Sequence, residues 1–268
     1  MASNTTFIIV PGAWHPASSL EPIMEPLRAA GYNVTGIDLA SFGAEPPLND
    51  FKADIDLVSN AIEDAAEKGQ DVVVFMHSYG GVVGTEACRG LGKKERKASG
   101  KEGGVIRLIF CTAFLVDEGE SAEINQFGQT DIIALGVSIM DVLNNKPLPW
   151  FIVSDNGARV EVDKPEDVFY NDLSREEAQK CIDKLAHHSY RCLGNKLTYA
   201  AYKDIPTTYL YCAKDNAIPL FAQQKMVKDA QILGVDVDTL TLESSHSPFL
   251  SMPDEVVAAC REAAVGKV

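Results

Sequence analysis

The chain has 268 residues, of which 46% are hydrophobic and 23% are charged, a balance typical of globular proteins rather than of disordered or collagen-like ones. Its 24 Lys and Arg residues against 38 Asp and Glu residues give a formal net charge of -14, which opposes binding to nucleic acids and to anionic membranes. No apolar run approaches the roughly 20 residues that a membrane-spanning helix needs.

The N-terminal sequence and the cysteines both favour a cytoplasmic protein. A buried-strand pattern begins at Phe7, with no basic segment or small-residue cleavage site before it. The six cysteines have no CxxC or metal-ligand spacing, so we expect reduced and mostly buried thiols; they are Cys88, Cys111, Cys181, Cys192, Cys212 and Cys260. We expect no nucleic-acid or membrane partner and no metal, and a homodimer is compatible with the sequence.

One basic segment interrupts the acidic composition. It contains seven cations and two acids between its ends at Arg89 and Arg107, and glycines divide it. We interpret it as a solvated loop, and a docking patch is the alternative.

Short apolar runs alternate with longer helical patterns along the chain, which is typical of β-α-β units and a parallel sheet. Six runs have strand character, at residues 7–10, 33–39, 72–75, 105–114, 207–212 and 235–242. Ser18 and Glu21 have the spacing of a capping box at the start of the first helix. The sequence predicts an α/β fold with a mostly parallel sheet of about six strands flanked by helices.

About 90 residues separate the fourth and fifth predicted strands, which is too long for a simple crossover connection. We interpret residues 118–202 as a helical cap inserted into a single domain of residues 1–268. Ser174 and Glu177 form a second capping box, ahead of apolar residues at helical spacing.

Ser78 is the candidate nucleophile. It lies between a buried strand and a glycine-rich helix start, where a tight turn would expose its hydroxyl at the carboxyl edge of the sheet. Side chains at Gly80 or Gly81 would collide with the strand as the chain reverses. The usual motif is G-x-S-x-G, but Met76 occupies the first glycine position, so the turn must open slightly or direct the methionine elsewhere.

Asp215 and His246 are candidates for the other two members of a catalytic triad, because a serine needs a base and the base needs an orienting carboxylate. Asp215 follows the strand at 207–212, and His246 follows the last strand. The order Ser, Asp, His is the one that the α/β-hydrolase fold produces. Asp117, after the fourth strand, is the rival acid.

A developing oxyanion needs hydrogen-bond donors, usually the N–H after the nucleophile and one from the loop after an early strand. Tyr79 and Ala13 are the candidates, and Ala13 belongs to the loop after the first predicted strand.

These motifs resemble those of the α/β-hydrolase superfamily, in the branch of small methylesterases and hydroxynitrile lyases. The resemblance spans almost the whole chain and rests on four segments: Pro11-Gly12-Ala13-Trp14-His15, His77-Ser78-Tyr79-Gly80-Gly81, Asp215-Asn216-Ala217-Ile218-Pro219 and His246-Ser247-Pro248-Phe249. It implies a helical cap, a Ser78/Asp215/His246 triad and no cofactor.

The chain also departs from this family pattern. Pro11 replaces the histidine of the usual His-Gly loop. Hydroxynitrile lyases that resemble this chain have a threonine and a lysine where Gly12 and Ser247 stand, which argues against cyanohydrin cleavage. Epoxide hydrolases and haloalkane dehalogenases need an aspartate nucleophile, and Ser78 argues against both.

We therefore expect a serine hydrolase that cleaves a small hydrophobic carboxylic ester, lactone or thioester through an acyl-enzyme. The alternatives are a non-hydrolytic biosynthetic reaction on the same triad, such as cyclisation, elimination or C–C cleavage, and a ligand receptor with little turnover. Apolar residues are the candidates for substrate binding: Trp14, Phe127, Leu135, Met140, Trp150 and Phe151.

Overall fold

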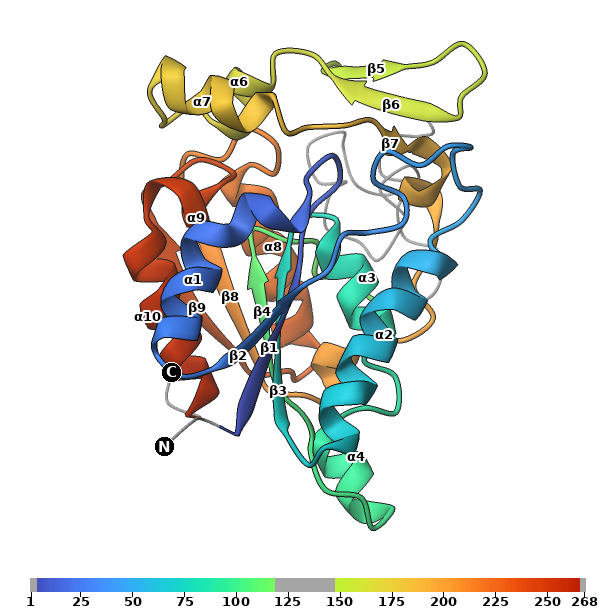
Figure 1. Cartoon of the computed structure of the whole chain (residues 1–268), viewed down its shortest axis with the longest axis vertical. Coiled ribbons are helices and arrows are strands. Elements are labelled where there is room, and N and C mark those ends of the chain that lie inside the picture. The colour runs from blue at the N-terminus through green and yellow to red at the C-terminus, as the bar shows by residue number, and fades with distance from the viewer. Residues whose placement is uncertain (1–3, 119–147, 266–268) are drawn as a thin grey trace.

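A six-stranded sheet forms the centre of the computed structural model, which describes residues 4–118 and 148–265 (Figure 1). The strand order is β2-β1-β3-β4-β8-β9, and every neighbouring pair is parallel. The strands are β1 (Thr5–Val10), β2 (Asn33–Gly36), β3 (Asp71–His77), β4 (Gly104–Cys111), β8 (Thr207–Cys212) and β9 (Val237–Leu242). The predicted fold class and strand number are confirmed.

Helices cover both faces of the sheet because its strands alternate apolar side chains between the two faces. Phe7 and Ile9 of β1 pack with the helices of one face, whereas Ile8 and Val10 belong to the core of the other. The first face carries α1 (Glu21–Ala29) and α10 (Pro253–Ala264). The second face carries α2 (Lys52–Glu67), α3 (Gly80–Ala87) and α8 (Leu220–Ile232).

The predicted cap region, residues 118–202, contains strands as well as helices. Over its described part it forms an antiparallel sheet of β5 (Phe151–Val153), β6 (Arg159–Val162) and β7 (His188–Ser189), with α6 (Pro165–Phe169) and α7 (Arg175–Ile182). Two short 3₁₀ segments follow, η4 (Tyr190–Gly194) and η5 (Ala201–Lys203). Figure 1 places β5, β6, α6 and α7 above one end of the central sheet.

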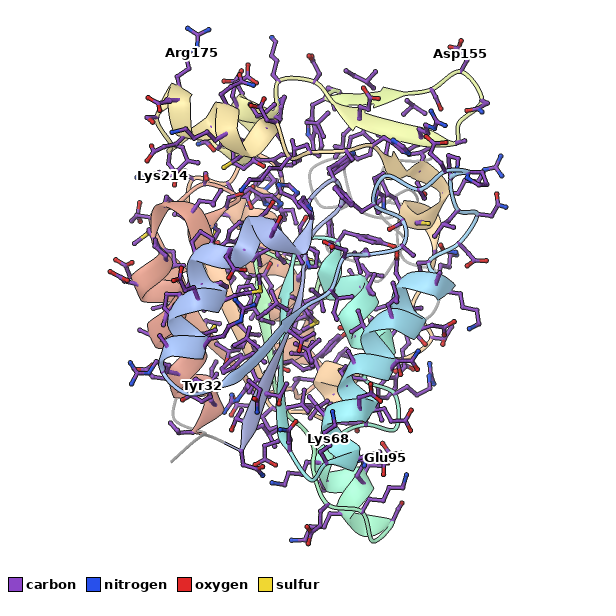
Figure 2. All side chains as sticks on the ribbon, viewed as in Figure 1. Tyr32, Lys68, Glu95, Asp155, Arg175 and Lys214 are labelled. Carbon is purple, nitrogen blue, oxygen red and sulfur yellow. The ribbon has the colours of Figure 1, made fainter. Side chains whose placement is uncertain are left out.

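The sequence predicted helices in this region but not its three short strands. The Ser174–Glu177 capping box is confirmed at the start of α7, with both reciprocal hydrogen bonds present. These strands were not predicted because they are only two to four residues long, which is too short to show periodicity. Asp155 and Arg175 point outwards from the cap region (Figure 2), which leaves its inner side to face the sheet.

The first predicted capping box is wrong. Residues Ala17–Leu20 form a 3₁₀ turn, η1, and α1 starts after it with Leu20 as a cap that makes no side-chain hydrogen bond. The N–H of Ala17 instead donates to Asp38 Oδ1 at 2.7 Å. A carboxylate distant in sequence thus satisfies a helix-start donor, which local spacing cannot reveal.

The basic segment is not a solvated loop. It contains the short helix α4 (Lys93–Ala98), and its end enters β4. Arg96 and Arg107 are buried, and they pair with Glu67 at 3.0 Å and Asp238 at 2.6 Å. These cations hold neighbouring elements together, so part of the segment is structural.

All six cysteines are free, and five of them are buried, as expected for thiols that fill apolar space. No helix within residues 4–118 and 148–265 combines the length and apolar character needed to cross a bilayer.

Candidate active site

Ser78 occupies a strained turn between β3 and α3. Its φ of 52° lies in the left-handed region, which a non-glycine residue adopts only at an energetic cost. Its carbonyl accepts hydrogen bonds from the N–H groups of Gly81 at 3.0 Å and Phe114 at 3.1 Å. The side chain therefore projects from a turn fixed by both α3 and the segment after β4, which is the nucleophile-elbow geometry.

Two glycines of α3 make this turn possible. A Cβ on Gly80 would lie 2.6 Å from the carbonyl oxygens of Val10 and Pro11, so no side chain fits where α3 crosses the end of β1. A Cβ on Gly84 would lie 2.5 Å from Met76 Sδ. The Met76 side chain therefore fills space that Gly84 leaves open. The sequence alone did not show where this side chain would fit.

Asp215 and His246 are hydrogen-bonded to each other. Asp215 follows β8 and His246 follows β9, and the parallel strands bring both segments to the same edge of the sheet. His246 Nδ1 donates to Asp215 Oδ2 at 2.7 Å, and both side chains are at most 1% exposed. With Nδ1 directed at the carboxylate, Nε2 is the ring nitrogen that a general base would use.

The Asp215 carboxylate is held by further donors. Oδ1 accepts the N–H groups of Ala217 at 2.7 Å and Ile218 at 2.9 Å. Oδ2 also accepts the hydroxyl of Thr112, which follows β4. A buried carboxylate with this many donors is fixed in position.

The rival acid lies elsewhere. Asp117 forms an ion pair with Lys203, and both side chains are about one-third exposed. Among the described residues, no hydrogen bond joins Asp117 to His246. The geometry therefore favours Asp215 as the partner of the imidazole.

Among those residues, no hydrogen bond joins Ser78 Oγ to His246 either. Catalytic hydrogen bonds are often long or poorly aligned in ligand-free enzymes and tighten when substrate binds. The arrangement therefore supplies an oriented base at the same sheet edge as the serine, and their direct contact stays a prediction.

His77 supports His246 from within the sheet. Its Nε2–H donates to the His246 carbonyl at 2.8 Å, and the two rings lie 4.6 Å apart. Burial, together with the neighbouring histidines His246 and His15, lowers the pKa of His77 well below its usual value. A neutral His77 adds no charge beside the imidazole that must accept a proton.

The loop after β1 brings Ala13 beside the candidate nucleophile and ties it to the cap region. Trp14 has a φ of 66°, and its indole N–H donates to the Val160 carbonyl of β6 at 2.8 Å. His15 Nδ1–H donates to the Ala13 carbonyl at 2.7 Å, while Nε2 accepts the Tyr170 hydroxyl at 2.9 Å. Sequence reasoning assigned no role to His15, because Tyr170 lies far away in the chain.

Both candidate oxyanion donors line a common pocket with Ser78. Within the described part of the chain, no backbone hydrogen bond uses the N–H of Ala13 or Tyr79, so both remain available to a substrate oxygen. Of the six side chains predicted for substrate binding, Trp14, Trp150 and Phe151 line this pocket, and Phe127, Leu135 and Met140 lie outside the described residues.

The pocket lining is largely apolar, and half of its described residues were not predicted as site residues. The additional lining residues are Phe114, Leu148, Phe169, Leu193, Ala217 and Ile218. Ala217 and Ile218 could have been chosen from their position directly after Asp215. Trp14 and Trp150 pack with ring centroids 5.7 Å apart, so the aromatic wall joins the first loop to the cap region.

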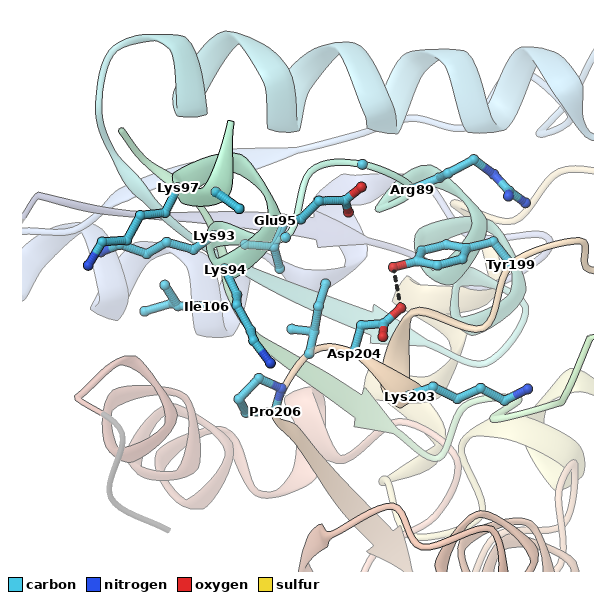
Figure 3. Close-up of a pocket in the computed structure, with 15 residues that line it drawn as sticks. Arg89, Lys93, Lys94, Glu95, Lys97, Ile106, Tyr199, Lys203, Asp204 and Pro206 are labelled. Carbon is cyan, nitrogen blue, oxygen red and sulfur yellow. Dashed lines mark hydrogen bonds between the residues drawn. The ribbon is translucent and has the colours of Figure 1, made fainter. Parts of the chain in front are cut away.

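Figure 3 shows a second concave region, at the amino ends of β4 and β8. Ser78 follows the carboxyl end of the parallel strand β3, so it lies at the opposite end of the sheet. Its lining includes five cations, and three of them have acidic partners: Arg89 pairs with Glu86, Lys93 with Asp71, and Lys203 with Asp117. Tyr199 donates to Asp204 at 3.0 Å. The described residues that line this groove include no serine, cysteine or histidine, so they form no nucleophile and base pair like the one proposed at Ser78.

Among the described residues, no group of three or more His, Cys, Asp or Glu side chains is arranged to hold a metal ion.

Sequence comparison places these features in a known family. A sequence model described as the alpha/beta hydrolase family matches residues 7–259. The chain belongs to the alpha/beta hydrolase family. The alpha/beta hydrolase nvfD of Aspergillus novofumigatus is 32% identical over 257 residues, which cover 96% of this chain and 95% of that protein.

Further comparisons agree with the predicted branch of this hydrolase family. Methylesterase 7 of Arabidopsis thaliana is 24% identical over 96% of this chain and 95% of its own length. A pyrethroid hydrolase from Sphingobium faniae superposes with a TM-score of 0.70, at 20% identity over 97% of both chains. The resemblance to small methylesterases is confirmed, and the structural match shows the shared fold.

Proposed function

We propose that this alpha/beta hydrolase is a serine esterase for small, uncharged carboxylic esters with an aromatic or aliphatic hydrophobic part. The observation that carries the proposal is the buried pair of His246 and Asp215, aligned at the sheet edge that also carries the strained Ser78 turn. A protein that only bound ligands would not need an imidazole with one nitrogen fixed by a carboxylate. Esterase names among the relatives support the reaction class.

In the proposed mechanism, Ser78 Oγ attacks the ester carbonyl carbon while its proton passes to His246 Nε2. Asp215 stabilises the resulting imidazolium, and the N–H groups of Ala13 and Tyr79 hold the oxyanion. His246 returns the proton to the departing alcohol, and the acyl group remains bound to Ser78 Oγ. Water then attacks the acyl carbon, with His246 again accepting and returning a proton, and releases the acid.

The pocket supports the choice of substrate. The lining residues that the structure describes include no Lys, Arg, Asp or Glu side chain, and aromatic rings form much of this lining. A charged substrate would lose its hydration there without gaining an ion pair. We therefore expect aryl and short alkyl esters to react faster than esters that carry a carboxylate or an ammonium group.

The test is pre-steady-state kinetics with neutral p-nitrophenyl esters. The native protein should release a burst of p-nitrophenolate stoichiometric with enzyme whenever deacylation is slower than acylation. Ser78→Ala should lose the burst and reduce kcat by about 10⁶-fold. Ligand binding without turnover in both proteins would favour a receptor, and turnover that survives in Ser78→Ala would exclude Ser78 as the nucleophile.

A further inference from the structure

A second buried carboxylate lies behind the nucleophile turn. Asp54, in the first turn of α2, has no solvent-exposed surface. Its Oδ1 accepts the Ser41 N–H at 2.9 Å, and its Oδ2 accepts the hydroxyls of Ser41 at 2.6 Å and Tyr79 at 3.0 Å. Three donors on one carboxylate are the pattern expected for an ionised acid.

The surroundings of Asp54 make this arrangement costly. None of the ion pairs formed between described residues includes Asp54, so no described cation offsets a charge there. Burial is the largest effect and raises the pKa of Asp54 above its ordinary value, and the donors from Ser41 and Tyr79 offset only part of this rise. A carboxylate in such a place is tolerated only through its hydrogen bonds, and one of its three donors belongs to a candidate catalytic residue.

Tyr79 is held at both ends of its side chain. Asp54 fixes its hydroxyl, and the His188 ring packs against its ring with centroids 4.8 Å apart. The Tyr79 residue is 1% exposed. Its backbone N–H directly follows Ser78, so a fixed side chain also restricts the orientation of that N–H group.

The same carboxylate reaches the cap region through Ser41. The Ser41 carbonyl accepts the Ser189 N–H of β7 at 3.1 Å. The Ser189 hydroxyl in turn accepts the N–H of Leu48 at 3.0 Å. Asp54 thus lies where the nucleophile turn, the segment after β2 and the cap region meet.

We propose that Asp54 is a positioning residue for the oxyanion hole, acting through the Tyr79 phenol to hold the Tyr79 N–H toward the substrate oxygen. The inference rests on the proposed esterase function. Asp54 lies behind the turn and is absent from the pocket lining, so it acts through Tyr79 and not by touching substrate. Loss of the contact should weaken transition-state binding more than substrate binding.

The test is a double-mutant cycle of Asp54→Asn and Tyr79→Phe, read with a neutral p-nitrophenyl ester. Each single variant should lower kcat about tenfold and change KM less than twofold. The kcat of the double variant should be no lower than that of the less active single variant, because both changes act on the same hydrogen bond between Asp54 and Tyr79. Asp64→Asn, on the exposed side of the same helix, is the matched control and should behave as the native protein.

A second readout separates positioning from general loosening. An aryl trifluoromethyl ketone forms an oxyanion when Ser78 Oγ adds to its carbonyl carbon and the serine proton passes to His246. Its affinity should fall by the same factor as kcat in each variant. A merely structural role would lower the melting temperature and leave this affinity and the kcat of the folded fraction unchanged.

The outcomes are distinguishable. Native protein that neither turns over esters nor binds the ketone would overturn the esterase proposal and this inference with it. Active native protein with unchanged kcat in both single variants would overturn only the role of Asp54. If Asp54→Asn does not fold, Tyr79→Phe decides alone, because it keeps the carboxylate and the ring; native kcat in that variant would overturn the role.

Discussion

Charged side chains are buried in the candidate active site at one end of the parallel sheet and mostly exposed in the groove at the other end. At the carboxyl ends, Asp215 is buried, and each of its oxygens accepts at least two hydrogen bonds. At the amino ends, the groove of Figure 3 carries exposed charges such as Arg89, 52% exposed, which pairs with Glu86. Screened surface pairs contribute little free energy, whereas buried, fixed dipoles can stabilise a transition state. Orientation and burial, more than the number of charges, distinguish the candidate active site from the groove.

The largest expected effect is a loss of kcat/KM that distinguishes Asp215 from Asp117. Asp215→Asn should lower kcat/KM about 10⁴-fold, because an amide cannot hold the required tautomer of His246. Asp117→Asn, the matched control, should change it less than twofold, because Asp117 belongs to a partly exposed ion pair. Steady-state ester hydrolysis measures both. Loss of activity confined to Asp117→Asn would reverse the assignment of the acid.

A second prediction concerns the pH dependence of stability. Burial lowers the pKa of His15 from 6.5 to about 4, so the folded state favours the neutral ring. This stabilisation is complete above pH 6.5 and is lost as pH falls toward 4. His15 alone contributes about 3 kcal/mol to the loss in unfolding free energy. Urea unfolding at pH 7 and 4.5 should show a smaller difference for His15→Asn; an equal difference would contradict the burial account.

A third prediction concerns the contact between Met76 and Gly84 beneath the nucleophile turn. Gly84→Ala should cost about 1–3 kcal/mol of stability, since its Cβ would overlap Met76 Sδ. Met76→Ala should cost about 2–5 kcal/mol by leaving a cavity. The double variant should be more stable than the sum of both costs predicts, because the new methyl fills part of that cavity. Strict additivity in thermal unfolding would show that the two side chains do not share this space.

The smallest effect is expected at the charged groove. Lys94 and Lys97 line it and are exposed. Changing both to Ala should alter the unfolding free energy by no more than about 0.5 kcal/mol and should leave kcat/KM within twofold. A large loss of esterase activity in this variant would break the distinction between the two ends of the sheet.

Much of the fold could be predicted because its signals are local. The buried apolar runs at β1, β3 and β8 predict a parallel sheet. Loops at the carboxyl ends of parallel strands meet at one edge of the sheet. That rule brings Ser78, Asp215 and His246 to one edge from their positions after strands, but it applies equally to Asp117, which follows β4. The match of residues 7–259 to the alpha/beta hydrolase family agrees with the predicted fold.

The missed features depend on contacts between distant segments. Asp54 looks like an ordinary acid in a helix start, and only the structure shows Tyr79 and Ser41 donating to it. Likewise, the link between His15 and Tyr170 spans 155 positions. The basic segment was misinterpreted because glycines and lysines suggest a loop, whereas Arg96 packs inside the protein. The composition of a segment indicates how readily its residues are solvated. Whether a charged side chain is buried beside a partner depends on the tertiary structure.

The most direct test of the proposed active site is mass spectrometry of the intact protein and its peptides after reaction with a fluorophosphonate. The proposed mechanism predicts one phosphonyl group per chain, attached to the peptide that contains Ser78 and absent from Ser78→Ala. His246→Ala should react far more slowly, because its serine lacks a base. Equal labelling of native protein and Ser78→Ala, or an adduct on another residue, would contradict it.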